Sequence, residues 1–282
     1  MAIIPTIEYE TKLQERLSAP MVWKEICLVK YTNSGIWRNP YLTDPTIGTG
    51  TRGTGYTSTA IATVDDTVTI NTYKYAAEHI DDADLAQKTF SDFMEIADRI
   101  GTLLNETMET AMLAEHAQWT NFDNASIGGA AGNITVAISN IKAIITGVKR
   151  EIREAGGGDL MNRNGAFIQW READFELVEQ LASSEGFSTA DDTLKNGIKQ
   201  GFKYMGVEHY STSKNASGHI FGGVKKAFAV GVVKSTYGKV KTIINPVVGG
   251  AQISGIGLES RIDYKYMAWA KMVPVLFDIL VA

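Results

Sequence analysis

Histidine and cysteine are the side chains of this sequence best suited to catalysis or metal binding, and the chain has few of them. The histidines are His79, His116, His209 and His219, and the single cysteine is Cys27. No two histidines have the short spacing that is typical of paired metal ligands. A lone cysteine can form neither a disulfide nor a cysteine-based metal site within one chain, and a buried, unreactive thiol is its commoner role. We therefore predict that these residues form no catalytic or metal site.

Two further patterns resemble binding sites but have simpler structural explanations. Asp81, Asp82 and Asp84 form a small acidic group that suggests a cation site. They precede a helical pattern, however, where aspartate caps the helix and interacts favourably with its dipole. Gly156–Gly158 lacks the lysine and hydroxyl residue of a phosphate-binding loop and follows a helical pattern, so we expect it to end that helix. The sequence predicts no catalytic, cofactor-binding or metal-binding residue, and a protein that is not an enzyme.

Composition narrows the possible functions further. The chain has 282 residues, of which 44% are hydrophobic and 21% charged, with a net charge of −5. This is the composition of a folded protein with one large or two modest domains. The negative charge argues against a broad nucleic-acid-binding surface, which needs clustered lysine and arginine, but it is compatible with a protein that only encloses nucleic acid. We expect no secretion signal, a reducing compartment and no association with a membrane.

The elements that must position any site are dominated by one stretch, Asp82–Ala117. Its apolar residues recur at the i, i+3 and i+4 positions that mark one buried face of a helix. About 36 residues at about 1.5 Å each give a rod of about 54 Å, whereas a compact chain of this length is roughly 50 Å across. The length favours a flat or elongated body. A helical bundle or coiled coil is the alternative, although the strict heptad of a coiled coil is absent.

Residues 35–68 form a second informative stretch, rich in glycine and threonine. We expect two β-rich arms joined by a long Gly/Thr tip. Such a ribbon has too few large apolar residues to form its own core, and an isolated two-stranded ribbon is marginally stable in water. It is either a mobile surface loop or an extension that becomes ordered on a neighbouring subunit.

The remainder of the chain alternates between helical and strand patterns. The order helix, strand, helix, strands predicts an α/β unit over residues 128–250. Two strand-like runs follow, Leu258–Met267 and Ala270–Val281, and we expect both to pair with Val68–Ala76. The long helix would then belong to a discontinuous domain built from both sides of the α/β unit.

This order of segments resembles the major capsid proteins of tailed double-stranded DNA bacteriophages, whose coat fold is named after phage Hong Kong ninety-seven. Thr69–Gln87 is similar to the junction of that family between a strand and its spine helix. Two short sequence patterns of its axial domain are similar to segments of this chain, Asn196–Tyr210 and Gly223–Val230. No single motif is diagnostic, and the specificity lies in the order of the segments.

The resemblance implies an α+β capsid fold with a long spine helix. Its expected parts are an N-terminal arm (1–34), a β-rich extended loop (35–72), a peripheral domain with the spine helix (73–127), an axial domain (128–250) and returning peripheral strands (251–282). It also implies self-assembly as pentamers and hexamers into an icosahedral shell around a double-stranded DNA genome. The implied partners are scaffolding, portal and decoration proteins, and the implied location is the virion capsid, assembled in the host cytoplasm.

Two alternatives and one departure from the family qualify this expectation. An encapsulin-like bacterial nanocompartment shares the fold but holds a cargo enzyme, and a soluble α/β enzyme would use residues 35–68 as a lid.

Some members of the family join their subunits by an isopeptide bond from a lysine in the extended loop. Residues 33–73 contain no lysine, and Arg52 is the only basic residue near the tip. We therefore expect no such cross-link.

Overall fold

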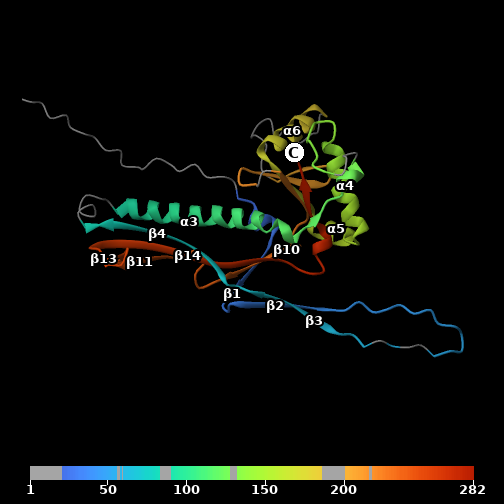
Figure 1. Ribbon diagram of the computed structural model, residues 1–282, viewed down its shortest axis with the longest axis horizontal. Coiled ribbons are helices and arrows are strands. Elements are labelled where there is room, and N and C mark those ends of the chain that lie inside the picture. The colour runs from blue at the N-terminus through green and yellow to red at the C-terminus, as the bar shows by residue number, and fades with distance from the viewer. Residues whose placement is uncertain are drawn as a thin grey trace, which may run out of the picture.

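The computed structural model describes residues 21–55, 58, 60–82, 90–127, 132–185, 201–215 and 218–282. It confirms the α+β class, with one long helix, a five-stranded sheet, a six-stranded sheet and a separate two-stranded ribbon. The long helix lies along the five-stranded sheet, and the six-stranded sheet and its helices form a second body at one end (Figure 1). The molecule is elongated, as the length of the predicted helix required.

The long helix, α3 (Phe90–Ala114), covers 25 residues, or about 38 Å at about 1.5 Å per residue. Its buried face carries Ile100, Leu104, Met108 and Met112 at the predicted spacing. A short 3₁₀ turn, η1 (His116–Gln118), follows it. Asp81, one of the two expected capping residues, is the last residue of strand β4 (Thr72–Asp81), and residues 83–89, which include Asp84, lie outside the described residues. The amphipathic helix is therefore confirmed over Phe90–Ala114.

The five-stranded sheet is built around one strand, β14 (Gly255–Ala268). On one side β14 pairs antiparallel with β4 (Thr72–Asp81), and on the other with β10 (Phe228–Val233) and β11 (Val240–Ile244). A parallel strand, β1 (Leu28–Thr32), extends the sheet beyond β10. The predicted pairing of the first tail run with the strand before the long helix is confirmed.

One face of β14 packs against α3. From Leu258 to Ala268 nearly every second residue of β14 is buried, as expected for a strand with one covered face. The Tyr266 hydroxyl donates a hydrogen bond to the Met108 carbonyl oxygen of α3 at 2.9 Å. The sheet therefore turns an apolar face to the helix.

The six-stranded sheet belongs to an α/β unit. Its helices α4 (Ile141–Glu154), α5 (Gly158–Asn164) and α6 (Glu172–Ser184) pack on its strands. In spatial order the strands are β5 (Thr120–Asn121), β15 (Leu276–Leu280), β9 (His219–Val224), β6 (Ala166–Arg171), β8 (Val207–Thr212) and β7 (Phe202–Tyr204).

Five strands belong to other sheets than the ranges expected from sequence imply. β1, within 1–34, joins the five-stranded sheet, and β5, within 73–127, joins the six-stranded sheet. β15, within 251–282, pairs with β9 and not with Val68–Ala76. Four of its five residues are buried, which suits a strand covered on both faces and not a position beside the exposed β4. β10 and β11, within 128–250, join the five-stranded sheet. The expectation that both tail runs share one sheet is wrong.

The glycines Gly156–Gly158 end a helix, as predicted, but a second helix that the sequence analysis missed follows directly. α4 ends at Glu154, and Gly156 adopts a left-handed backbone conformation with φ +77°, which favours glycine. The second helix, α5, then begins at once at Gly158.

A single apolar core joins the two sheets. Trp119, immediately after η1, makes edge-to-face contacts with Phe221 of β9 and Phe228 of β10, with ring centroids 5.1 and 5.2 Å apart. Because Phe221 lies in the six-stranded sheet and Phe228 in the five-stranded sheet, Trp119 connects them directly. Aromatic contacts of this kind contribute roughly 0.5–1.5 kcal/mol each beyond the burial of area.

A buried carboxylate fixes three segments to one another. Glu109 of α3 accepts hydrogen bonds from the backbone N–H groups of Val22 (3.1 Å) and Trp23 (2.8 Å), at the start of α1 (Trp23–Ile26). Its other oxygen accepts a hydrogen bond from the Gln169 side-chain amide of β6 at 2.7 Å. Burial raises the pKa of Glu109 above its usual value, and these three hydrogen bonds oppose that rise.

Removing the Glu109 side chain should therefore be far more costly than neutralising it. Glu109→Ala leaves three buried donors without an acceptor, and we expect it to lower the free energy of unfolding by roughly 2–4 kcal/mol. In Glu109→Gln the new side-chain oxygen can still accept the two backbone N–H groups. The new amide N–H can donate to Gln169 Oε1 after a flip of the Gln169 amide, because that oxygen has no hydrogen-bond partner among the described residues. We expect that variant to lose less than about 1 kcal/mol at neutral pH in urea denaturation.

The pH dependence provides the control. A raised folded-state pKa means that the folded chain binds the proton more tightly, so this contribution to stability is complete below the unfolded pKa and is lost as the pH rises through the folded value. The stability of the Glu109→Gln variant should not show this loss as the pH rises. Equal destabilisation by both variants would contradict the role given to the three hydrogen bonds.

Candidate functional site

A two-stranded ribbon projects from the body and is the first candidate for function. β2 (Ile36–Leu42) pairs antiparallel with β3 (Thr63–Thr69) over seven residue pairs. The chain between them extends well beyond the pairing as a long tip (Figure 1). The prediction of two β-rich arms and a Gly/Thr tip is confirmed. The ribbon exposes several large apolar side chains, including Ile47, which is 95% exposed.

The ribbon contacts the body at its base and along one side. Trp37 contacts Trp269 edge to face at 4.7 Å, and Val68 is buried beside them. Asp66 accepts a hydrogen bond from the Ala270 N–H at 2.9 Å, and Lys271 forms an ion pair with Asp44. These contacts set the direction of the ribbon, while the described part of the tip beyond Asp44 is exposed.

The five-stranded sheet also has an uncovered face. α3 packs on one side, and on the other Tyr73 and Tyr75 of β4 are largely exposed. The Arg261 guanidinium of β14 stacks on the Tyr73 ring at 4.1 Å. The far edge of the sheet exposes Ile243 and Ile244 as well. Exposed apolar groups at a strand edge favour contact with another chain.

The single thiol has the environment expected of an unreactive residue. Cys27 is fully buried, with its Sγ 3.4 Å from Met112 Sδ, and burial raises the pKa of the thiol. Asp82 accepts a hydrogen bond from the Ser254 hydroxyl. Lys225 of the adjacent basic residues Lys225 and Lys226 is paired with Glu208 at 2.5 Å.

The four histidines separate into three environments. His79 lies on the exposed strand β4, and His209 is buried. His116 and His219 lie side by side, with ring centroids 4.3 Å apart. The sequence analysis missed this pairing, because the two residues are far apart in the chain and their spacing carries no signal.

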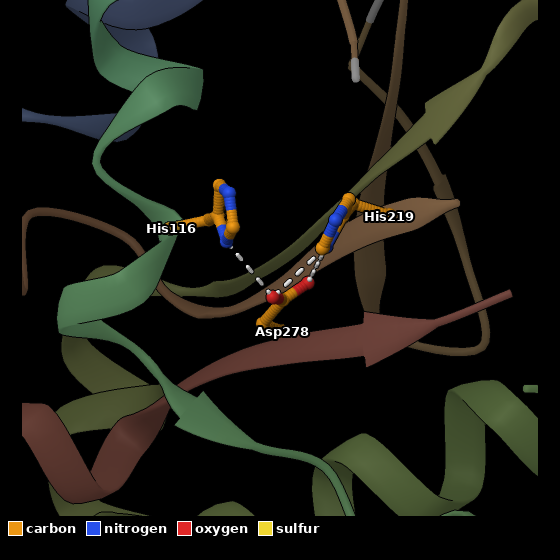
Figure 2. Close-up of side chains that lie close together, drawn as sticks. All are labelled: His116, His219 and Asp278. Atoms are coloured by element: carbon orange, nitrogen blue, oxygen red, sulfur yellow. Dashed lines mark hydrogen bonds and ion pairs between the residues drawn. The ribbon is translucent and has the colours of Figure 1, made fainter. Parts of the chain in front are cut away.

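Asp278 of β15 completes a cluster with these two histidines (Figure 2). His219 Nδ1 is 2.9 and 3.0 Å from the two Asp278 carboxylate oxygens, and His116 Nδ1 is 3.3 Å from one of them. The pairing of β9 with β15 places His219 opposite Leu280, two residues from Asp278, and η1 brings His116 to the other side. Two imidazoles and one carboxylate therefore converge from three elements.

His209 has a structural role. The Trp170 indole N–H donates a hydrogen bond to His209 Nδ1 at 2.9 Å, and Nε2 is 3.2 Å from the Tyr204 carbonyl oxygen. These partners require the neutral tautomer that carries its proton on Nε2. Burial lowers the pKa of His209 from 6.5 to about 4.

This depressed pKa predicts an acid-sensitive fold. Between pH 6.5 and about 4 the unfolded chain binds a proton that the folded chain does not, so stability is lost as the pH falls through this window. We expect His209 to contribute a loss on the order of 3 kcal/mol. His209→Gln should remove this part of the slope in urea denaturation, while His79→Gln, at an exposed position, should retain it. An unchanged slope in His209→Gln would contradict the assignment.

Comparison with known proteins finds similar structures in phage and GTA particles. No protein-family model and no curated protein matches the sequence. A solved structure from Mycobacterium phage Che8 matches with a TM-score of 0.71 at 11% identity, over 98% of this chain and 96% of that one. The capsid of the native GTA particle matches with a TM-score of 0.68 at 14% identity, over 99% and 95% of the two chains. The mature capsid of bacteriophage PhiM1 matches with a TM-score of 0.62 at 14% identity, over 99% and 92%.

These similarities establish the fold. They cover nearly the whole chain at low sequence identity, so the arrangement of elements is shared although few residues are. The chain has the α+β fold of phage capsid proteins, as the resemblance predicted. Among the described residues, no helix is both long enough and apolar enough to cross a membrane.

Proposed function

We propose that this chain is a major capsid protein, whose copies assemble as pentamers and hexamers into an icosahedral shell around a double-stranded DNA genome. The observation that carries the proposal is the ribbon β2–β3. It projects from a body with a capsid fold and exposes apolar side chains that the described part of the chain leaves uncovered. A neighbouring subunit supplies that cover. A stable contact of this kind buries roughly 2,000 Å² or more.

On the basis of this proposed function, we assign a capsid role to each part of the molecule. Residues 1–34 act as the N-terminal arm and residues 35–72 as the extended loop. The five-stranded sheet with α3 acts as the peripheral domain, and the six-stranded sheet with its helices as the axial domain. Relative to the expected ranges, β1, β10 and β11 belong to the peripheral domain, and β5 and β15 to the axial domain.

The chemistry of the chain agrees with a container. A net charge of −5 suits a wall that encloses DNA without gripping it. We propose that the protein is not an enzyme, that it works with scaffolding, portal and decoration proteins, and that it is assembled in the host cytoplasm and resides in the virion capsid. Purified particles that contain DNA support this function, whereas particles filled with a protein cargo would indicate a nanocompartment.

Shortening the ribbon tests the proposal directly. Thr43 and Ala62 are already hydrogen-bonded to each other, with the Thr43 N–H 2.9 Å from the Ala62 carbonyl oxygen. Residues 44–61 can therefore be replaced by an Asn-Gly turn, which closes a two-stranded hairpin. We expect a folded chain that no longer forms shells, as judged by negative-stain microscopy and size-exclusion chromatography.

Two controls make the result interpretable. The shortened chain should keep its circular dichroism spectrum and melt within about 3 °C of the parent, because the replaced residues contribute little to the core. Lys271→Met, which removes the ion pair with Asp44 that the deletion also removes, should still assemble. Normal shells from the shortened chain would overturn the proposed role of the ribbon.

The lysine-free loop predicts separable subunits. Residues 33–73 contain no lysine to form an isopeptide bond. Shells heated in denaturant with reducing agent should therefore release a single monomer band on a denaturing gel. A ladder of covalent oligomers would show that another lysine forms the cross-link.

A further inference from the structure

The His116, His219 and Asp278 cluster lies where the two bodies of the molecule meet. His116 is in η1, directly after α3, and α3 packs on the five-stranded sheet. His219 and Asp278 are in β9 and β15 of the six-stranded sheet. Figure 2 shows the three side chains pointing toward one another from these separate elements. Any ligand held by all three residues would tie the end of the long helix to the second sheet.

The distances between the polar atoms match those between the ligands of a metal ion. In a tetrahedral site with bonds of about 2.0–2.1 Å, neighbouring ligand atoms are about 3.3 Å apart. Here His116 Nδ1 is 3.3 Å, and His219 Nδ1 2.9 Å, from Asp278 carboxylate oxygens. One ligand atom from each residue lies within 4.8 Å of the others. Small side-chain rotations are sufficient to place an ion between them.

The charge of the cluster also favours a cation. The Asp278 side chain is only 4% exposed, and a buried carboxylate is costly unless it is paired. Two neutral imidazoles can each donate one Nδ1–H to it, which leaves one negative charge in the cluster. A divalent cation bound to the two Nδ1 atoms would take the place of these N–H groups, with each imidazole carrying its proton on Nε2 instead, and would pair with the buried carboxylate.

The surroundings hold the ligands in place and leave them accessible. The side chains of His116 and His219 are 34% and 20% exposed, so an ion can enter and a water molecule can occupy a remaining position. Strand pairing fixes Asp278, whose carbonyl oxygen accepts the Phe122 N–H at 2.9 Å. The Phe221 ring lies nearly parallel to that of His219, with 9° between the planes. Supporting contacts of this kind orient metal ligands.

We propose that His116, His219 and Asp278 bind one divalent transition-metal ion, most suitably zinc, which clamps the end of α3 to the six-stranded sheet. Two imidazoles and a carboxylate form a ligand set that zinc accepts readily, whereas calcium and magnesium prefer oxygen ligands throughout. The site requires nothing from a second subunit, so the proposal does not depend on the proposed shell function.

Metal titration of the purified full chain tests the site. Tag-free protein stripped with EDTA is titrated with zinc chloride by calorimetry at pH 7.5, and cobalt chloride is added separately to record the visible absorption of four-coordinate cobalt. We expect one zinc per chain. At zinc concentrations 100-fold above Kd, the melting temperature should rise by about 5 °C.

Matched variants decide whether the cluster is responsible. His116→Gln and His219→Gln, at partly exposed positions where folding is expected to survive, should each weaken zinc binding by at least about 10-fold. They should also remove the visible cobalt spectrum. His79→Gln alters a histidine on the exposed strand β4 and should leave both signals unchanged.

Two results would overturn the proposal. One is zinc binding by the parent chain that is no tighter than that of the His116→Gln/His219→Gln double variant. The other is equal weakening by His79→Gln. Either result would show that the cluster is held by hydrogen bonds alone.

Discussion

The packing of α3 along β14 is the contact on which the rest of the structure depends. α3 presents one apolar face, and β14 turns its buried alternate residues toward it. Each buried Leu, Ile or Met side chain contributes roughly 1.5–3 kcal/mol, so the row from Ile100 to Met112, about 18 Å long at about 1.5 Å per residue, holds the helix along the sheet. The elongated shape follows, because neither element can shorten without exposing this face.

Two other features follow from that contact. α3 covers one face of the five-stranded sheet, and the base of the ribbon covers the opposite face only beside β10, so the part of that face around β4 and most of the ribbon stay exposed among the described residues. The chain must also turn sharply at the end of α3 to enter the second sheet. Trp119 fills this turn with aromatic contacts to both sheets, and His116 and Asp278 meet beside it. The turn between the two sheets therefore holds both the aromatic contacts of Trp119 and the polar cluster of His116 and Asp278.

The features that could be predicted from the sequence are those set by local patterns. The periodicity of Phe90–Ala114 indicates a helix with one buried face, and the Gly/Thr content of 35–68 indicates a ribbon without a core. The partner of a strand is a different kind of property. β15 joins β9 because it needs cover on both faces, and that need depends on elements more than fifty residues away. The histidine cluster was missed for the same reason, since only the pairing of β9 with β15 brings His219 to Asp278.

Two buried ionisable groups, Glu109 and His209, make the stability of the fold depend on pH in opposite ways. Burial raises the pKa of Glu109 and lowers that of His209, so each is biased toward its neutral form. The effects on stability are opposite in sign: the contribution of Glu109 is lost as the pH rises, and that of His209 is lost as it falls. The two trends oppose each other in the acidic range, because the Glu109 window begins at 4.5 and the His209 window runs from 6.5 down to about 4. Both groups lie at contacts between separate segments, since Glu109 joins α3 to α1 and β6, and His209 joins β8 to β6 and β7, so the same hydrogen bonds that fix these segments also set the response of the fold to pH.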